Sequence, residues 1–96
     1  MDLLKAMESF TRVAKAKSFA AAAEGMGMSR AIVSKHVKDL EDHLGVRLFH
    51  RTTRRMSLTE IGLKHYVFCQ RVLDEIVTEH EEATRLQTTP RGVIKM

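Results

Sequence analysis

The sequence predicts a mainly α-helical fold that carries one short β-hairpin. Residues that interrupt helices are sparse, because the 96 residues include one proline, five glycines and no asparagine. Apolar residues recur at helical spacing along most of the chain, and alternation of apolar and polar residues is found in residues 46–51 and again in residues 56–58. At roughly 100–200 residues per domain, the length allows one compact domain with one appended element, and it excludes a two-lobed enzyme.

The basic residues gather in the N-terminal part of the chain. The whole sequence has a formal net charge of +4. Residues 1–59 hold 11 basic and 6 acidic residues, a net charge of +5, whereas residues 60–96 hold 5 basic and 6 acidic residues, a net charge of −1. This asymmetry predicts an N-terminal region that meets an anion such as nucleic acid, and a C-terminal region with another task.

Several classes of protein are excluded by what the sequence lacks. Cys69 is the single cysteine, so no internal disulfide can form and a cysteine-based zinc site is not expected. The five histidines show no HExxH spacing, and we expect neither a metal site nor a cofactor in this chain. No run approaches about 18 apolar residues and no secretory signal is evident, so we expect a cytoplasmic protein without a membrane span.

The N-terminal half is predicted to form three helices, each with its own capping residue. Asp2 caps the first helix, and Ser18 caps a short second helix over residues 19–24 with four consecutive alanines. Gly25 or Gly27 takes the left-handed conformation in the turn that follows, and Ser29 caps a third helix that runs to residue 44. The apolar stripes of the first and third helices are Leu3, Met7, Phe10 and Ala14, and Val33, Val37, Leu40 and Leu44, respectively.

The C-terminal half is predicted to form the hairpin and one long helix. Residues 46–51 and 56–58 alternate in polarity around a polar turn at residues 52–55, which predicts two strands with arginines at the tip. Thr59 caps a helix from residue 60 to about residue 86, which is too long to be covered by the domain before it. Its broad apolar face therefore needs a partner. The stripe that we predict to form the dimer interface is Tyr66, Cys69, Leu73, Ile76 and Ala83.

The order of helix, short helix, tight turn, helix and basic hairpin is typical of a winged helix-turn-helix. In that arrangement the second helix of the pair enters the major groove of DNA, so its first turns must be small or polar while its opposite face is apolar. Residues 29–38 meet this requirement. We expect base reading by Arg30, Ala31, Ser34 and Lys35. We expect contacts with the DNA backbone or the minor groove from Ser18, Ser29, Lys38, Arg51, Arg54 and Arg55.

Residues 7–62 resemble the DNA-binding domain of the LysR-type transcriptional regulators of bacteria. The likeness is spread in order along the segment, and it includes Ser18-Phe19, Leu40-Glu41, Leu44-Gly45, Leu48-Phe49 and Leu58-Thr59. Met26 stands where the family usually has leucine, and Lys35 stands where arginine is common. Lysine keeps the charge but lacks the bidentate guanidinium fork, so this departure bears on the target sequence rather than on DNA binding itself.

The resemblance implies three segments and a set of partners. Residues 1–59 would form the winged helix-turn-helix domain, residues 60–87 the linker helix that pairs antiparallel with its copy in a homodimer, and residues 88–96 the start of an effector domain. Members of that family are about three times this length and carry an effector domain that binds a small-molecule inducer, so we expect the chain to be a fragment or an engineered piece of a longer regulator. Double-stranded DNA, read as two half-sites, is the expected partner, and the resemblance is also compatible with a tetramer of the full-length protein.

Three alternatives stay open. The long helix would also suit a protein-interaction or oligomerisation module with incidental basic charge, and the absence of any DNA mobility shift at low salt would favour that reading. A small enzyme would need a concave pocket and a catalytic set, and the spacing of residues signals neither. A different winged-helix family, such as the antibiotic-resistance repressors, would keep DNA binding but change the wing and the dimer. The operator, the regulated genes, the inducer and the direction of regulation do not follow from the sequence.

Overall fold

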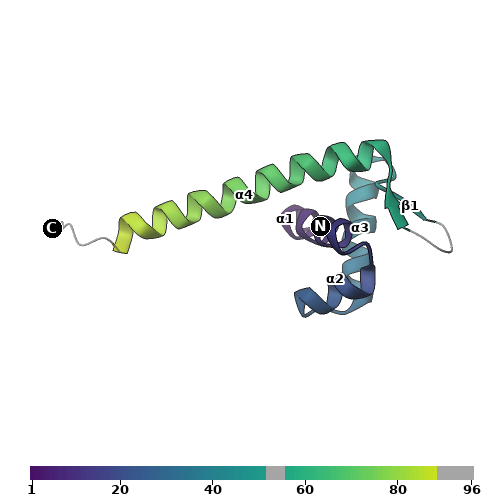
Figure 1. The fold of residues 1–96 in the computed structure, drawn as a ribbon, viewed down its shortest axis with the longest axis horizontal. Helices are drawn as coiled ribbons and strands as arrows, with labels where there is room; N and C mark the ends of the chain where they lie inside the picture. The colour runs from purple at the N-terminus through teal and green to yellow at the C-terminus, as the bar shows by residue number, and fades with distance from the viewer. Residues whose placement is uncertain (52–55, 89–96) are drawn as a thin grey trace.

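The computed structural model describes residues 1–51 and 56–88, which form four helices and a two-stranded hairpin (Figure 1). In chain order the elements are α1 (Leu3–Ala16), α2 (Phe19–Met26), α3 (Arg30–Leu44), β1 (Phe49–Arg51), β2 (Met56–Leu58) and α4 (Glu60–Thr88). The first three helices gather in a compact group, and α4 runs as a long rod past this group and beyond it (Figure 1). The predicted fold class, a winged helix-turn-helix followed by a long helix, is confirmed.

The predicted N-caps begin the first three helices. The side-chain oxygens of Asp2, Ser18 and Ser29 each accept a hydrogen bond from the backbone N–H three residues further on, at 3.2, 3.1 and 3.2 Å. Such a bond satisfies one of the backbone donors that the first turn of a helix leaves without a partner. The starting points of α1, α2 and α3 are therefore fixed by local chemistry.

Left-handed residues end the same three helices. Gly27 and Gly45 follow α2 and α3 with φ angles of 66° and 71°, which glycine adopts without steric cost. Gly25 lies inside α2, because this helix extends two residues further than predicted. Lys17 takes the same conformation after α1, with φ of 57°. The tight turn between α2 and α3 thus depends on Gly27.

One core joins the helices to the hairpin, and Phe10 lies at its centre. The ring centroid of Phe10 is 5.4 Å from that of Phe49 on β1 and 6.4 Å from that of Tyr66 on α4. Edge-to-face contacts of this kind add to the stabilisation that burial of the rings provides. The other buried apolar residues are Ala6, Met7, Val13, Ala22, Ala23, Val33, Val37, Leu40, Leu48 and Cys69.

Some predictions about burial and strand length are wrong. Leu3 and Leu44 lie on predicted core stripes, yet they are 45% and 38% exposed. Cys69, predicted at a dimer interface, is fully buried in the core of its own chain, since α4 packs against α1 there. The first strand begins at residue 49 rather than 46. The predicted turn at residues 52–55 lies outside the described residues.

The joint between the hairpin and α4 is built around Thr59. Its N–H donates to the Leu48 carbonyl oxygen at 2.9 Å, and its hydroxyl donates to the Arg47 carbonyl oxygen at 2.7 Å. The same hydroxyl accepts from the Gly62 N–H at 2.9 Å, which caps the helix as predicted. Gly62 is buried, and a Cβ atom there would overlap the Leu48 carbonyl oxygen. This close approach sets the direction in which α4 leaves the domain.

Candidate nucleic-acid interface

The third helix divides into a buried face and an exposed face. Val33, Val37 and Leu40 are buried against α1 and α2. Ala31, Lys35 and Lys38 point outward at spacings of i, i+4 and i+7, so they lie within about 60° of one another around the helix axis. The four predicted base-reading residues, Arg30, Ala31, Ser34 and Lys35, are all exposed. The outer face near the start of α3 therefore carries small and basic groups with free access to solvent.

The N-termini of α2 and α3 bring two serine hydroxyls to the surface of the helix pair. Ser18 is half-buried and Ser29 is exposed. Each hydroxyl accepts from a backbone N–H, and a hydroxyl that accepts one bond still has its own proton to donate. A helix N-terminus also carries a partial positive charge that favours anions. Both positions therefore suit a phosphate oxygen, as the sequence predicts.

Two lysines on the outer face are already paired with carboxylates of the same helix. The Lys35 Nζ atom lies 2.9 Å from Asp39 Oδ2, and the Lys38 Nζ atom lies 3.4 Å from Asp42 Oδ2. The hydrogen bond from Lys35 lowers the pKa of Asp39 below its ordinary value. Sequence reasoning identified both lysines but not the aspartates, although their i, i+4 spacing is the signal for such pairs.

Arg51 has a structural task that the sequence does not reveal. Its Nη2 atom lies 2.8 Å from Oε1 of Glu41 on α3, and its guanidinium carbon lies 5.8 Å from the centroid of the Phe19 ring on α2. The other carboxylate oxygen of Glu41 accepts from the backbone N–H of Leu48 at 2.8 Å and from that of Phe49 at 3.4 Å. Glu41 therefore joins α3 to the first strand of the wing.

This arrangement fixes the base of the wing. The strands pair antiparallel, with Phe49 opposite Leu58 and Arg51 opposite Met56. Because Arg51 is held by Glu41, its charge is balanced inside the protein and its predicted contact with DNA stays a prediction. Arg54 and Arg55 lie outside the described residues, and their predicted contacts with the backbone or the minor groove also stay predictions.

Two further residues around α3 escaped sequence reasoning. Ile32 is exposed although it is large and apolar, and it lies beside the predicted base-reading residues. His36 is half-buried on the inner side, where its Nδ1 atom lies 2.7 Å from the hydroxyl of the buried Ser9 on α1. Ile32 could have been found as the apolar residue that does not fit the core stripe. The bond to Ser9 spans 27 residues and leaves no local signal.

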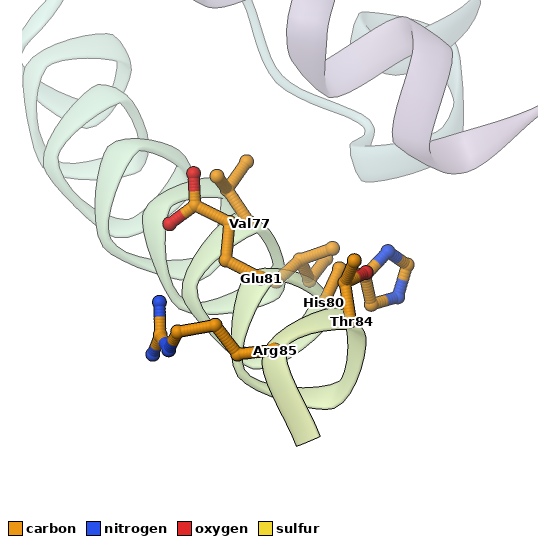
Figure 2. Close-up of a pocket in the computed structure, with 6 residues that line it drawn as sticks. Val77, His80, Glu81, Thr84 and Arg85 are labelled. Carbon is orange, nitrogen blue, oxygen red and sulfur yellow. The ribbon is translucent and has the colours of Figure 1, made fainter. Parts of the chain in front are cut away.

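Other kinds of site are not found among the residues that the structure describes. No group of histidine, cysteine, aspartate and glutamate side chains there could hold a metal ion, and no helix there is long and apolar enough to cross a membrane. Figure 2 shows a hollow along the distal part of α4. Its lining side chains all come from this one helix, so it is an open surface rather than an enclosed cavity. They are Ile76, Val77, His80, Glu81, Thr84 and Arg85.

The helix pair, the exposed polar face of α3 and the adjoining hairpin define a winged helix-turn-helix DNA-binding domain. The sequence profile described as "Bacterial regulatory helix-turn-helix protein, lysR family" matches residues 4–63. The chain belongs to this family. The family description and the names of its relatives are those of transcriptional regulators rather than of enzymes.

Curated relatives align with the whole length of the chain. The chain is 46% identical over 97 residues to an HTH-type transcriptional repressor of Pseudomonas aeruginosa, an alignment that covers 100% of this chain and 30% of that protein. It is 40% identical over 96 residues to the HTH-type transcriptional activator AaeR of Escherichia coli, with 100% and 31% covered. The chain thus spans about 30% of the length of these relatives.

Solved structures of DNA complexes have the same fold. The complex of the CbnR DNA-binding domain with DNA matches with a TM-score of 0.77 and 28% identity, and the match covers 88% of this chain and 95% of that chain. The complex of the BenM DNA-binding domain with catB site 1 DNA matches with a TM-score of 0.85 and 24% identity, over 88% of this chain and 94% of that chain.

Proposed function

We propose that this chain binds double-stranded DNA at specific sequences, with α3 in the major groove and the wing against the backbone or in the minor groove. The observation that carries this proposal is the division of α3 into a buried apolar face and an exposed face of small and basic residues. The major groove of B-form DNA, about 12 Å wide, admits one α-helix. The similarity to a DNA-binding domain solved in complex with DNA supports DNA binding by this chain.

Each group on the outer face suits a particular feature of the DNA. Arg30 and Lys35 are donors for the O6 and N7 atoms of guanine, and the Ala31 methyl group suits the methyl group of thymine. Ser18, Ser29 and Lys38 suit phosphate oxygens, which position a protein on DNA without reading its sequence. The division of labour is therefore base reading in the first two turns of α3 and phosphate contact around them.

We also propose that two copies pair through α4 in a homodimer. Along this helix, apolar side chains remain exposed on the faces that its own domain leaves uncovered, which is typical of an interaction surface. The exposed large apolar residues are Ile61, Leu63, Val67, Phe68, Val77 and Leu86. Of the predicted interface stripe, Leu73, Ile76 and Ala83 retain exposed surface and remain in the proposal, whereas Tyr66 is half-buried against Phe10 and Cys69 has no exposed surface. A symmetric dimer would present two α3 helices to half-sites one or more turns of DNA apart.

Partners beyond residues 1–96 belong to the proposal as well. A small-molecule inducer, implied by the family resemblance, would bind outside the described domain, and a tetramer would require contacts outside it. The cytoplasm is the proposed location because bacterial DNA lies there.

Selection of bound sequences from a random DNA pool tests the proposal. We expect the pool to converge on two half-sites in a symmetric arrangement, and we expect affinity for the selected DNA to fall steeply with salt. Light scattering of the free chain measures its mass and tests the dimer separately. A pool that stays random together with no mobility shift at low salt would instead favour a protein-interaction module.

A further inference from the structure

The outer face of α3 carries its own counter-charges. Arg30, Lys35 and Lys38 bring three positive charges to this face, and two aspartates, Asp39 and Asp42, bring two negative charges, which leaves a net charge of +1. Each aspartate lies one helical turn after a lysine and holds its ammonium group, at 2.9 Å in the first pair and 3.4 Å in the second. A helix expected to meet polyanionic DNA thus has most of its positive charge neutralised.

Each of these two carboxylates accepts a hydrogen bond from its lysine within α3 itself. The Asp42 side chain is 66% exposed, and the Asp39 side chain is 30% exposed. Exposed ion pairs at i, i+4 spacing contribute little to stability. Glu41, between them in sequence, is 6% exposed and joins α3 to the wing. The two aspartates therefore differ from Glu41, whose carboxylate is buried and bonded to another element.

We propose that Asp39 is a specificity-determining residue, which holds the base-reading Lys35 and thereby weakens its sequence-independent attachment to DNA phosphates. This inference rests on the proposed function, because it requires α3 to face DNA. Phosphates attract a free ammonium group at every position of any DNA, and this attraction supplies nearly all non-specific binding. A lysine that turns to a phosphate leaves its carboxylate unpaired close to the DNA backbone, where like charges repel.

A matching base compensates for the lost contact between Lys35 and its carboxylate, whereas a phosphate does not. Guanine presents two acceptors in the major groove, O6 and N7, and only at the correct position of the correct sequence. The ammonium group of Lys35 gains both acceptors there when it leaves Asp39. Asp39 thus penalises binding to random DNA more than binding to the selected sequence, whereas Asp42, whose partner Lys38 is expected to meet a phosphate on either DNA, penalises both alike.

The test compares Asp39→Asn, Asp42→Asn and the double variant with the unmodified chain on two DNA duplexes of equal length, the selected sequence and a random sequence. Asp74→Asn on the exposed side of α4 is the matched control, because it makes the same change of net charge away from α3. Each affinity is measured from about 50 mM to about 200 mM salt. Circular dichroism of every variant confirms the helical fold before binding is compared.

We expect affinity for random DNA to rise about fivefold for each aspartate on α3, the factor for one unit charge close to a phosphate in water. For Asp39→Asn we expect affinity for the selected sequence to rise less, so that the ratio of the two affinities falls, whereas Asp42→Asn and Asp74→Asn should leave this ratio unchanged. For Asp39→Asn, equal gains on both duplexes, gains no larger than those of the control, or a loss confined to the selected DNA would each overturn the inference. If the unmodified chain binds neither duplex, the proposed function itself is overturned, and this inference with it.

Discussion

Replacement of Glu41 by glutamine should weaken the attachment of the wing to α3. Glu41 is buried at the C-terminal part of α3, and its two carboxylate oxygens serve different partners. Oε1 accepts from Arg51 and Oε2 accepts from the backbone N–H of Leu48, both at 2.8 Å. Glutamine has the same shape but one acceptor oxygen, and its amide nitrogen would face one of these donors. The variant Glu41→Gln therefore leaves one buried or half-buried donor without an acceptor.

The expected loss of stability follows from the burial of the two charges. Removal of one partner from a fully buried ion pair costs about 3–5 kcal/mol. The Arg51 side chain is 37% exposed, whereas that of Glu41 is 6% exposed. Water therefore solvates part of the guanidinium group when its carboxylate partner is removed, which makes the loss of stability smaller. We expect the free energy of unfolding to fall by about 2 kcal/mol. For a domain of up to about 100 residues, this corresponds to a melting temperature lower by about 8–16 °C.

Thermal unfolding followed by far-ultraviolet circular dichroism measures this change. The control is Asp42→Asn, which removes a carboxylate next along the same helix from an exposed pair and should change stability by less than about 0.5 kcal/mol. In a double-mutant cycle, Arg51→Met should cost less in the Glu41→Gln background than in the parent chain. A melting temperature for Glu41→Gln equal to that of the control would refute the role given to Glu41.

Three further predictions concern the joint, the core and pH. Gly62→Ala should destabilise the domain by about 3 kcal/mol, because its Cβ atom would overlap the Leu48 carbonyl oxygen; an unchanged unfolding midpoint in denaturant would count against this close approach. Burial raises the pKa of the Cys69 thiol to about 11, so a thiol reagent should modify it slowly in the folded chain and fast in denaturant around neutral pH, and equal rates would contradict the burial. Desolvation lowers the pKa of His65, so the unfolded chain, with a histidine pKa near 6.5, binds this proton more readily than the folded chain. Stability should therefore be full above about pH 6.5 and fall as the pH drops below it, less steeply in His65→Phe, and equal slopes for the two chains would be evidence against this linkage.

The helix boundaries could be predicted because their causes are local. An N-cap hydrogen bond joins residues three apart, so Ser18 and Ser29 mark the starts of α2 and α3 in the sequence itself. Gly27 and Gly45 do the same at the helix ends. The exposed face of α3 follows from its apolar stripe in the same way, because both have the period of the helix.

What could not be predicted is which element covers each apolar face. Periodicity shows that Leu44 and Cys69 lie on apolar stripes, but it does not show that α4 packs on α1, where Cys69 is buried, while Leu44 stays exposed. Cys69 therefore belongs to the core rather than to an interface between chains. Arg51 illustrates the same limit, since its partner Glu41 is ten residues away across a turn. In sequence it is indistinguishable from the other arginines of the wing.

The affinity of Lys35→Ala for the selected sequence and for random DNA tests the central claim most directly. We expect the variant to lose about 1–3 kcal/mol of discrimination, or about 5- to 150-fold in the ratio of the two affinities, because Lys35 lies on the exposed face of α3. Lys64→Ala, at an exposed position on α4, should leave this ratio unchanged. An equal loss of affinity on both duplexes for Lys35→Ala would contradict base reading by the outer face of α3.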